Sequence, residues 1–309
     1  MIGAAFQLLV YGSMVTWLGP RALQGITVRG ITPRLGVAAW LTAILGVIGA
    51  WIGAVMITSI EAVRDGGRGD VLTVCLNVLG LSRHIGVPQP AVSIAAIAIS
   101  AAALTATTIF GRRVVLAARR LREHGRRHAR AAQVIGRPTG RPGVVVINAR
   151  VPVVYCVDGH PPTVVVTTAA LDGLDGAQLD AILAHERAHI AGRHHDLLVV
   201  LRALAAGLPR MPLFCAAAEA VSDLLEMCAD DAAARQHGAR PLLSGIATLI
   251  GTPSVPALGA AHTAVLARAQ RLAHPIGPRL RWGHRLAQIA TIGATLALPV
   301  QAALTCLAQ

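Results

Sequence analysis

The sequence predicts a mainly helical, α+β membrane protein with four transmembrane helices and one small antiparallel sheet. Two features of the composition predict this fold class. Of the 309 residues, 54% are apolar and only 14% are charged, and the mean hydropathy is +0.59. Soluble domains carry about a quarter charged residues, so this balance favours a membrane protein. The third observation is that four stretches of the chain are long and apolar enough to cross a bilayer.

A transmembrane helix needs about 20 predominantly apolar residues. The stretches that meet this requirement divide the chain into a three-span region (residues 1–110), a domain (111–284) and a final transmembrane helix (285–309). A further apolar run is interrupted by Arg202, and we expect it to form a buried or interfacial helix. The four predicted spans are Ile2–Leu18, Leu35–Ile60, Ala91–Phe110 and Leu286–Leu307, and the interrupted run is Leu197–Leu208.

The charge distribution predicts the orientation of the spans. All 28 basic residues are arginines, the formal net charge is +13, and Arg112–Arg150 contains eleven arginines and one acid, Glu123. Short arginine-rich segments stay in the cytoplasm. Arg21–Arg34 is also basic, whereas residues 61–90 offset their arginines with acids. We therefore expect the N-terminus and the loop 61–90 outside, and the domain 111–284 in the cytoplasm.

The basic run Arg112–Arg150 raises the alternative of nucleic-acid binding. It contains neither a recognition module nor the interleaved aromatic residues that such binding would need. An interfacial helix lying on anionic lipid explains the run more simply. We therefore expect a lipid bilayer as a partner and no direct nucleic-acid binding.

The termini and cysteines add two expectations. No basic residue precedes the first apolar run, so we expect a retained span rather than a cleaved signal peptide. The cysteines form no C-x-x-C pair, so we expect neither a disulfide framework nor a zinc knuckle. They are Cys75, Cys156, Cys215, Cys228 and Cys306.

Within the domain, short β-branched runs precede a helix. VVVINA (144–149), PVVYCV (152–157) and TVVVTT (163–168) are separated by turn residues and predict a small antiparallel sheet. The following segment, LDGLDGAQLDAILAHERAHIAG, has helical periodicity. Asp175 and Gln178 have the spacing of a capping box, and Gly192 is a plausible end of the helix.

This helix carries a possible metal site. His185 and His189 are four residues apart, so both imidazoles lie on one face and can bind the same ion. Glu186 is rotated by about 100° from His185, so its carboxylate can reach a metal-activated water without being a ligand. This is the H-E-x-x-H pattern, with glutamate as the general base. The alternative is a surface helix with unrelated histidines.

A catalytic zinc ion needs a third protein ligand and an open fourth position. AEAVSDLLEMCADDAAAR (218–235) reads as a second helix bearing Glu226 and, four residues later, Asp230. Glu226 can complete the ligand set, and Asp230 can accept the outer N–H of a ligand histidine. The alternative is an ordinary solvated acidic face that includes Asp223 and Asp231.

HERAH followed by EMCAD resembles the H-E-x-x-H … E-x-x-A-D signature of the gluzincin membrane peptidases. Three spans before the domain and one after it resemble the BlaR/MecR-type family more than the HtpX type. The resemblance covers residues 144–235 with specific motifs. It implies a cytoplasmic gluzincin-like zinc endopeptidase domain with His185, His189 and Glu226 as ligands and Glu186 as base. The BlaR/MecR sensors carry an extracellular penicillin-binding domain after the last span, and this chain ends at Gln309, so direct β-lactam sensing is not expected.

The resemblance also implies a cytosolic protein substrate, such as a transcriptional repressor in a signalling pathway. Two alternatives remain at this point: an HtpX-like quality-control protease that cuts membrane proteins, and an inactive signalling or scaffold protein. We expect an extended substrate to pair with an edge strand of the sheet, with PVVYCV and TVVVTT as the candidates.

Several other polar residues near the motifs have open roles. Tyr155, Arg235 and His237 are candidates for stabilising the oxyanion, although each is more simply structural. His194 and His195 are expected to be loop residues, and Asp196 an orienting or capping group.

Two further regions are interpreted as lying outside the site. Cys228 is off the face shared by Glu226 and Asp230, so we do not expect a thiolate ligand. The helix with His262 and Arg268–Arg271 is expected to turn a basic face to lipid headgroups.

Overall fold

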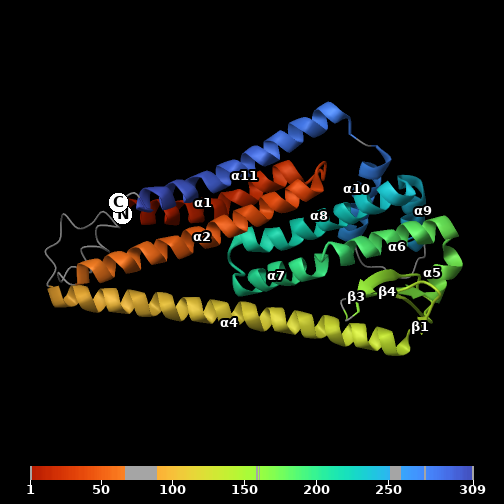
Figure 1. Cartoon of the computed structure of the whole chain (residues 1–309), viewed down its shortest axis with the longest axis horizontal. Helices are drawn as coiled ribbons and strands as arrows, with labels where there is room; N and C mark the ends of the chain where they lie inside the picture. The colour runs from red at the N-terminus through yellow and green to blue at the C-terminus, as the bar shows by residue number, and fades with distance from the viewer. Residues whose placement is uncertain are drawn as a thin grey trace.

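The computed structural model describes residues 2–66, 89–157, 159, 161–250, 259–274 and 276–307, and confirms a mostly helical protein with one small sheet (Figure 1). The helices are α1 (Ile2–Thr27), α2 (Pro33–Gly66), α4 (Gln89–Ile135), α5 (Thr168–Gly173), α6 (Gly176–Ala191), α7 (His194–Gly207), α8 (Pro212–His237), α9 (Ala239–Ile250), α10 (Gly259–Ala273) and α11 (Pro278–Leu307). The strands are β1 (Arg137–Pro138), β2 (Val144–Ile147), β3 (Val154–Val157) and β4 (Thr163–Thr167).

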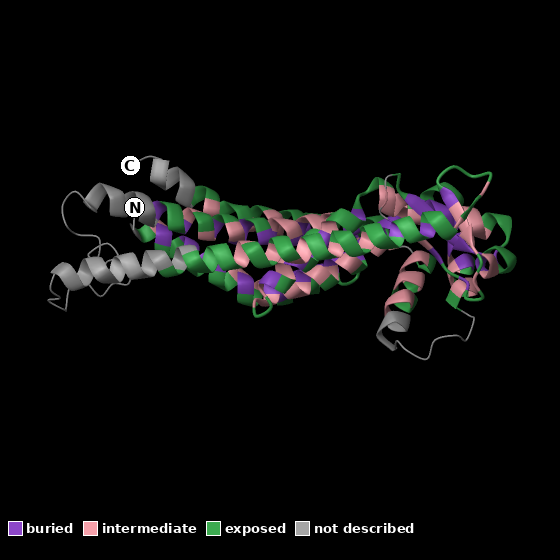
Figure 2. Ribbon diagram, turned by 90° about the horizontal axis from the view of Figure 1, so that it is seen from below, coloured by how far each residue is buried: buried purple, intermediate pink, exposed green. Residues whose placement is uncertain are grey.

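The molecule is elongated, with long helices at one end and the sheet with its covering helices at the other (Figures 1 and 2). Helices α1, α2 and α11 pack side by side, and α2 also packs against α8. A buried cluster joins α2 to α7 and α8, with Trp40, Leu201, Phe214 and Val221 at its centre. The long helices are therefore continuous with the core that supports the domain.

Among the described residues, one segment, Pro33–Ile57, is long and apolar enough to cross a membrane, with a mean hydropathy of 2.1. It coincides with the predicted span Leu35–Ile60. The other three predicted spans fall in α1, α4 and α11, which are helical, but the four-span topology stays a prediction. Residues 67–88, most of the predicted external loop, lie outside the described residues.

One polar residue of the predicted fourth span, Gln288, is buried between helices. Gln288 of α11 donates to the backbone oxygen of Ile26 at 3.3 Å and accepts a hydrogen bond from the Thr32 hydroxyl. A buried amide is tolerated when its hydrogen bonds are made. These contacts connect α11 to the turn between α1 and α2.

Helix α4 runs without a break from Gln89 to Ile135. The predicted boundary between residues 110 and 111 is therefore a position inside one helix. The basic second half of α4 packs against α7 and the sheet, with Ala129 and Ala132 buried against Val157 and Val165. One face of this half thus contacts protein, where the sequence had suggested a helix lying on lipid.

The interrupted apolar run Leu197–Leu208 lies within α7 and its C-cap. This helix packs between α4 and α8, with Val199, Leu201 and Ala203 buried. The expected helix is present with one face buried, whereas an interfacial position stays a prediction.

The prediction of an antiparallel sheet is wrong. The sheet is mixed, with the order β1-β2-β4-β3: β4 pairs parallel with β2 and antiparallel with β3. The chain leaves β2, forms β3 at the far edge, and returns through the middle as β4. The physical reason is burial: all five residues of β4 are buried, and a strand covered on both faces belongs in the middle of a sheet.

Strand β4 separates two layers of helix. Val164 and Val166 pack with buried residues of α6, whereas Val165 packs with α4 on the opposite face. TVVVTT is consequently not an edge strand, and that alternative for substrate pairing is wrong. β3, within PVVYCV, lies at the edge.

Local sequence fixes the limits of α6. The Asp175 carboxylate accepts a hydrogen bond from Gln178 N–H at 2.8 Å, and the Gln178 side chain accepts one from Asp175 N–H at 3.1 Å. Gly192 is the C-cap residue. The predicted capping box and helix end are both confirmed.

The capping box generates a stability prediction. Asp175→Ala removes the acceptor for one N–H at the start of α6 and should lower stability by about 1 kcal/mol, a fall in Tm of about 2–4 °C for a domain of this size. Asp175→Asn keeps a capping oxygen and is the matched control. Thermal unfolding in detergent measures both variants; equal Tm values for Asp175→Ala and the unmodified protein would contradict the role of the cap.

Candidate metal centre

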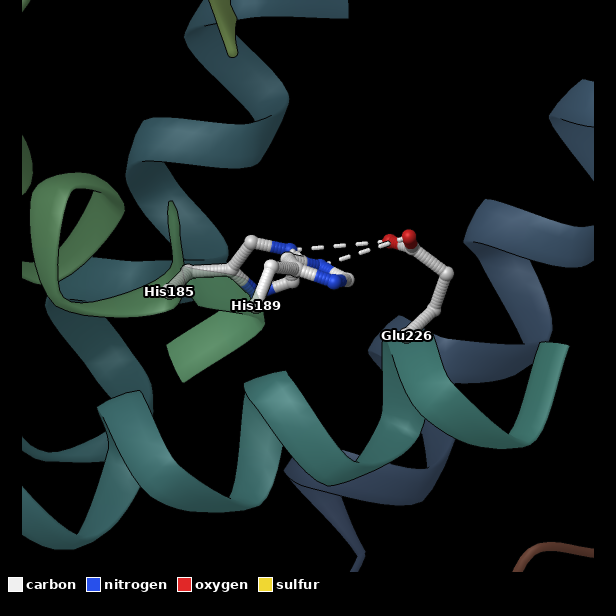
Figure 3. Close-up of side chains that lie close together, drawn as sticks. All are labelled: His185, His189 and Glu226. Atoms are coloured by element: carbon white, nitrogen blue, oxygen red, sulfur yellow. Dashed lines mark hydrogen bonds and ion pairs between the residues drawn. The ribbon is translucent and has the colours of Figure 1, made fainter. Parts of the chain in front are cut away.

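Two packed helices supply the residues that the sequence singled out. α6 carries His185, Glu186 and His189, and α8 carries Glu226 and Asp230. The helices lie against each other, and Figure 3 shows the two imidazoles of α6 pointing toward the Glu226 carboxylate. All five predicted site residues are thus in one region.

The distances within this cluster fit a single metal ion. His185 Nε2 lies 3.2 Å from His189 Nε2 and 3.5 Å from Glu226 Oε2, and His189 Nε2 lies 3.4 Å from Glu226 Oε1. A tetrahedral zinc ion with bonds of about 2.1 Å requires ligand atoms about 3.4 Å apart. Two imidazole nitrogens and one carboxylate are also a donor set that zinc accepts. The cluster could bind a metal ion.

Asp230 lies behind His185. Its Oδ1 is 3.1 Å from His185 Nδ1, and its side chain is completely buried. This contact orients the ring so that Nε2 faces His189 and Glu226. Burial alone would lower the pKa of His185, but Asp230 and Glu226 outweigh it and raise that pKa to about 9.

Arg268 of α10 completes the network, so its predicted contact with lipid headgroups is wrong. It donates to both oxygens of Asp230, at 2.8 and 2.7 Å, and lies 2.9 Å from Glu226 Oε2. Burial would raise the pKa of Asp230, yet Arg268 and His185 lower it to about 2. A buried carboxylate requires such a partner.

Arg271 likewise contacts protein. It pairs with Asp231 at 2.8 Å and donates to the backbone oxygens of Gly30 and Met227. The side chain of His262 lies outside the described side chains.

His194 is a site residue that the sequence analysis missed. Its Nδ1 lies 2.9 Å from Nδ1 of His189, and its side chain is buried. Because Arg193 adopts a left-handed conformation (φ 49°), the chain turns sharply between α6 and α7, and His194 returns toward His189. Burial and the nearby positive charge of His185 lower the pKa of His189 to about 4, so this ring is neutral.

Glu186 is held between the imidazoles and the edge strand. Its Oε2 accepts a hydrogen bond from Cys156 N–H of β3 at 2.9 Å. Burial raises the pKa of Glu186, which brings a carboxylate closer to the range useful for a general base. Burial and the Glu186 charge raise the pKa of Cys156 to about 12, so Cys156 stays a thiol.

The candidates for oxyanion stabilisation do not join this cluster through any contact among the described residues. Tyr155 packs on the α4 side of the sheet, and its hydroxyl lies 3.1 Å from His128 Nε2. Arg235 lines, with Arg34 and Arg187, a cavity that His194 also lines. His237 is exposed in the last turn of α8.

Two other expectations can be compared with the structure. Cys228 is buried, lines the cavity of Arg34 and Arg235, and is not among the grouped residues that could hold a metal ion. Asp196 lies in the first turn of α7 rather than at its N-cap, which is Arg193.

Comparison with known proteins gives one finding. Residues 116–249 match the model of peptidase family M48. This match supports an M48 metallopeptidase domain and includes every predicted ligand, although not Arg268. The chain has no match among curated proteins or solved structures.

The network predicts that Arg268 is required for stability. Arg268→Gln leaves the completely buried Asp230 without its bidentate partner, and breaking a buried ion pair costs about 3–5 kcal/mol. We expect a clear fall in Tm together with reduced metal content. Arg240→Gln, which changes an exposed arginine, is the control, and unchanged Tm and metal content in Arg268→Gln would contradict the assignment.

Proposed function

We propose that this protein is a membrane-embedded zinc endopeptidase. The observation that carries the proposal is the cluster of His185, His189 and Glu226, whose spacings suit one tetrahedral ion. The M48 match over residues 116–249 supports the peptidase class. Zinc would be held by His185, His189 and Glu226, with Asp230 orienting His185.

The mechanism follows from the positions of the side chains. A bound zinc ion would supply Lewis acidity that activates a water and polarises the scissile carbonyl. Glu186 takes the proton of the attacking water and returns it to the leaving amine. His189 remains neutral and available as a ligand because burial lowers its pKa.

The substrate segment pairs with the outer edge of β3. The Cys156 N–H points away from β4, since it donates to Glu186. Backbone groups alternate along a strand, so Val154 and Cys156 face the same outer edge. The Val154 groups and the Cys156 carbonyl are available to a peptide there, because the Cys156 N–H already donates to Glu186. β-Augmentation at this edge places an extended segment beside Glu186. A cytosolic protein, such as a repressor, is the proposed substrate, following the BlaR/MecR resemblance.

The location is proposed as the cell membrane, with four spans and the peptidase domain in the cytoplasm. Exposed apolar side chains on the long helices support it, since water-facing surfaces rarely carry so many. They are Phe6, Leu9, Val10, Met14, Trp17 and Leu18 of α1, Leu45, Ile52, Val55 and Met56 of α2, and Leu286, Ile289, Leu296 and Val300 of α11.

Glu186→Gln tests the mechanism. The variant should lose at least about 100-fold in kcat, because general acid–base catalysis contributes that much, while zinc stays at about one per chain. Mass spectrometry of a digested peptide library measures cleavage, and elemental analysis measures the metal.

Two matched variants complete this test. Glu226→Gln should lose both zinc and activity, whereas Glu219→Gln, an exposed glutamate on the same helix, should lose neither. Full cleavage by Glu186→Gln would refute its role as base, and a metal-free Glu219→Gln would show that metal loss is not specific to the site.

Membrane insertion predicts that the protein stays in the pellet after alkaline carbonate extraction. Trypsin, which cuts after arginine, should digest the domain in inverted vesicles and leave it intact in sealed right-side-out vesicles. Release by carbonate would contradict the spans, and the opposite protection pattern would contradict the orientation.

A further inference from the structure

A pocket of about 470 Å³ lies between the end of β3 and the C-terminal part of α6. Cys156 and Val157 of β3 and His189 and Ile190 of α6 are among the residues that line it. Cys156 is also the residue whose N–H contacts Glu186. A peptide paired with the outer edge of β3 therefore passes this pocket close to the metal-binding cluster.

The pocket is strongly basic. Arg122 and Arg126 of α4 and Arg193 between α6 and α7 line it, whereas Asp196 is the one carboxylate among the described lining residues. None of these three arginines forms an ion pair within the described part of the chain, and the nearest acid on α4, Glu123, is paired with Arg127 at 2.9 Å. Among the described lining residues of this pocket, positive charges therefore outnumber negative charges.

Two backbone features place these arginines. Gly125 lies between Arg122 and Arg126, and a Cβ there would meet His195 Nε2 at 3.3 Å, so glycine lets α4 approach the start of α7 closely. Arg193 is the one non-glycine residue with positive φ in the described ranges, a conformation that bulky side chains rarely adopt. The turn that returns His194 to His189 therefore also brings Arg193 to the pocket.

We propose that this pocket binds an acidic side chain of the substrate, aspartate or glutamate, and so selects peptide segments with a carboxylate near the scissile bond. The inference rests on the proposed peptidase function. Guanidinium groups recognise a carboxylate through paired N–H bonds, and neutral side chains of the same size leave the arginines without a partner.

The test compares extended ten-residue peptides of Val, Ala and Ser that carry one Glu or one Gln at each position in turn. The zinc-loaded full-length protein in detergent should cleave the Glu peptide at least about tenfold faster (kcat/KM) at one position, as expected for charge-assisted hydrogen bonds. Arg126→Gln should bring this Glu/Gln ratio close to one, mainly through slower cleavage of the Glu peptide. Arg126→Glu should reverse the preference toward Lys at the same position.

Arg120→Gln is the control, because Arg120 is exposed on α4 and does not line the pocket. Equal cleavage of Glu and Gln peptides at every position would overturn the proposal, as would a preference that Arg126→Gln leaves intact.

A binding measurement separates this proposal from the peptidase assignment. Fluorescence anisotropy with Glu186→Gln gives the Kd of the same labelled peptides without turnover. A preference for Glu that depends on Arg126, in the absence of cleavage by the unmodified protein, would support the pocket and refute the peptidase function. Binding without a charge preference would refute the pocket.

Discussion

The burial of the Asp230 carboxylate is the constraint that organises the site. An unpaired carboxylate in a fully buried position costs several kcal/mol, and Asp230 has no exposed surface. Arg268 supplies two N–H groups to it, and His185 Nδ1 lies 3.1 Å from its Oδ1. Helices α6, α8 and α10 must therefore keep their relative positions for Asp230 to stay charged, and the same positions direct His185 Nε2 toward Glu226.

A second constraint fixes the position of the edge strand β3 relative to the metal-binding cluster. β4 is buried on both faces, so it takes the centre of the sheet and leaves β3 at the edge. The valines of β4 that face α6 hold this helix against the sheet. Because α6 then packs against the edge strand β3, the Glu186 carboxylate can accept a hydrogen bond from Cys156 N–H. The general base and the peptide-binding edge are positioned by the same packing.

The sequence predicted features that depend on neighbouring residues. The capping box of α6, its end at Gly192, and the common face of His185 and His189 all follow from spacing within one helix. Glu226 and Asp230 could be named because they share a face of a second helix.

Features that depend on distant pairing were missed. Arg268 lies 38 residues beyond Asp230, and nothing in its own helix indicates a buried carboxylate partner. The parallel pairing of β2 with β4 depends on which strand is covered on both faces, which the similar valine-rich runs do not reveal. His194 contacts His189 only because Arg193 adopts positive φ, a conformation that the residue type does not favour.

Helix α4 sets the distance between the proposed membrane boundary and the pocket lined by Arg122 and Arg126. With Phe110 at that boundary, Arg122 lies twelve residues further along a continuous helix, or about 18 Å at 1.5 Å per residue. Ala129 and Ala132 attach this helix to the sheet, so its arginines keep their place relative to β3. On the proposed topology, a substrate segment would therefore extend beyond the bilayer surface to reach Arg122 and the pocket that it lines. Such a distance fits the proposed cytosolic substrate better than a residue within a membrane span.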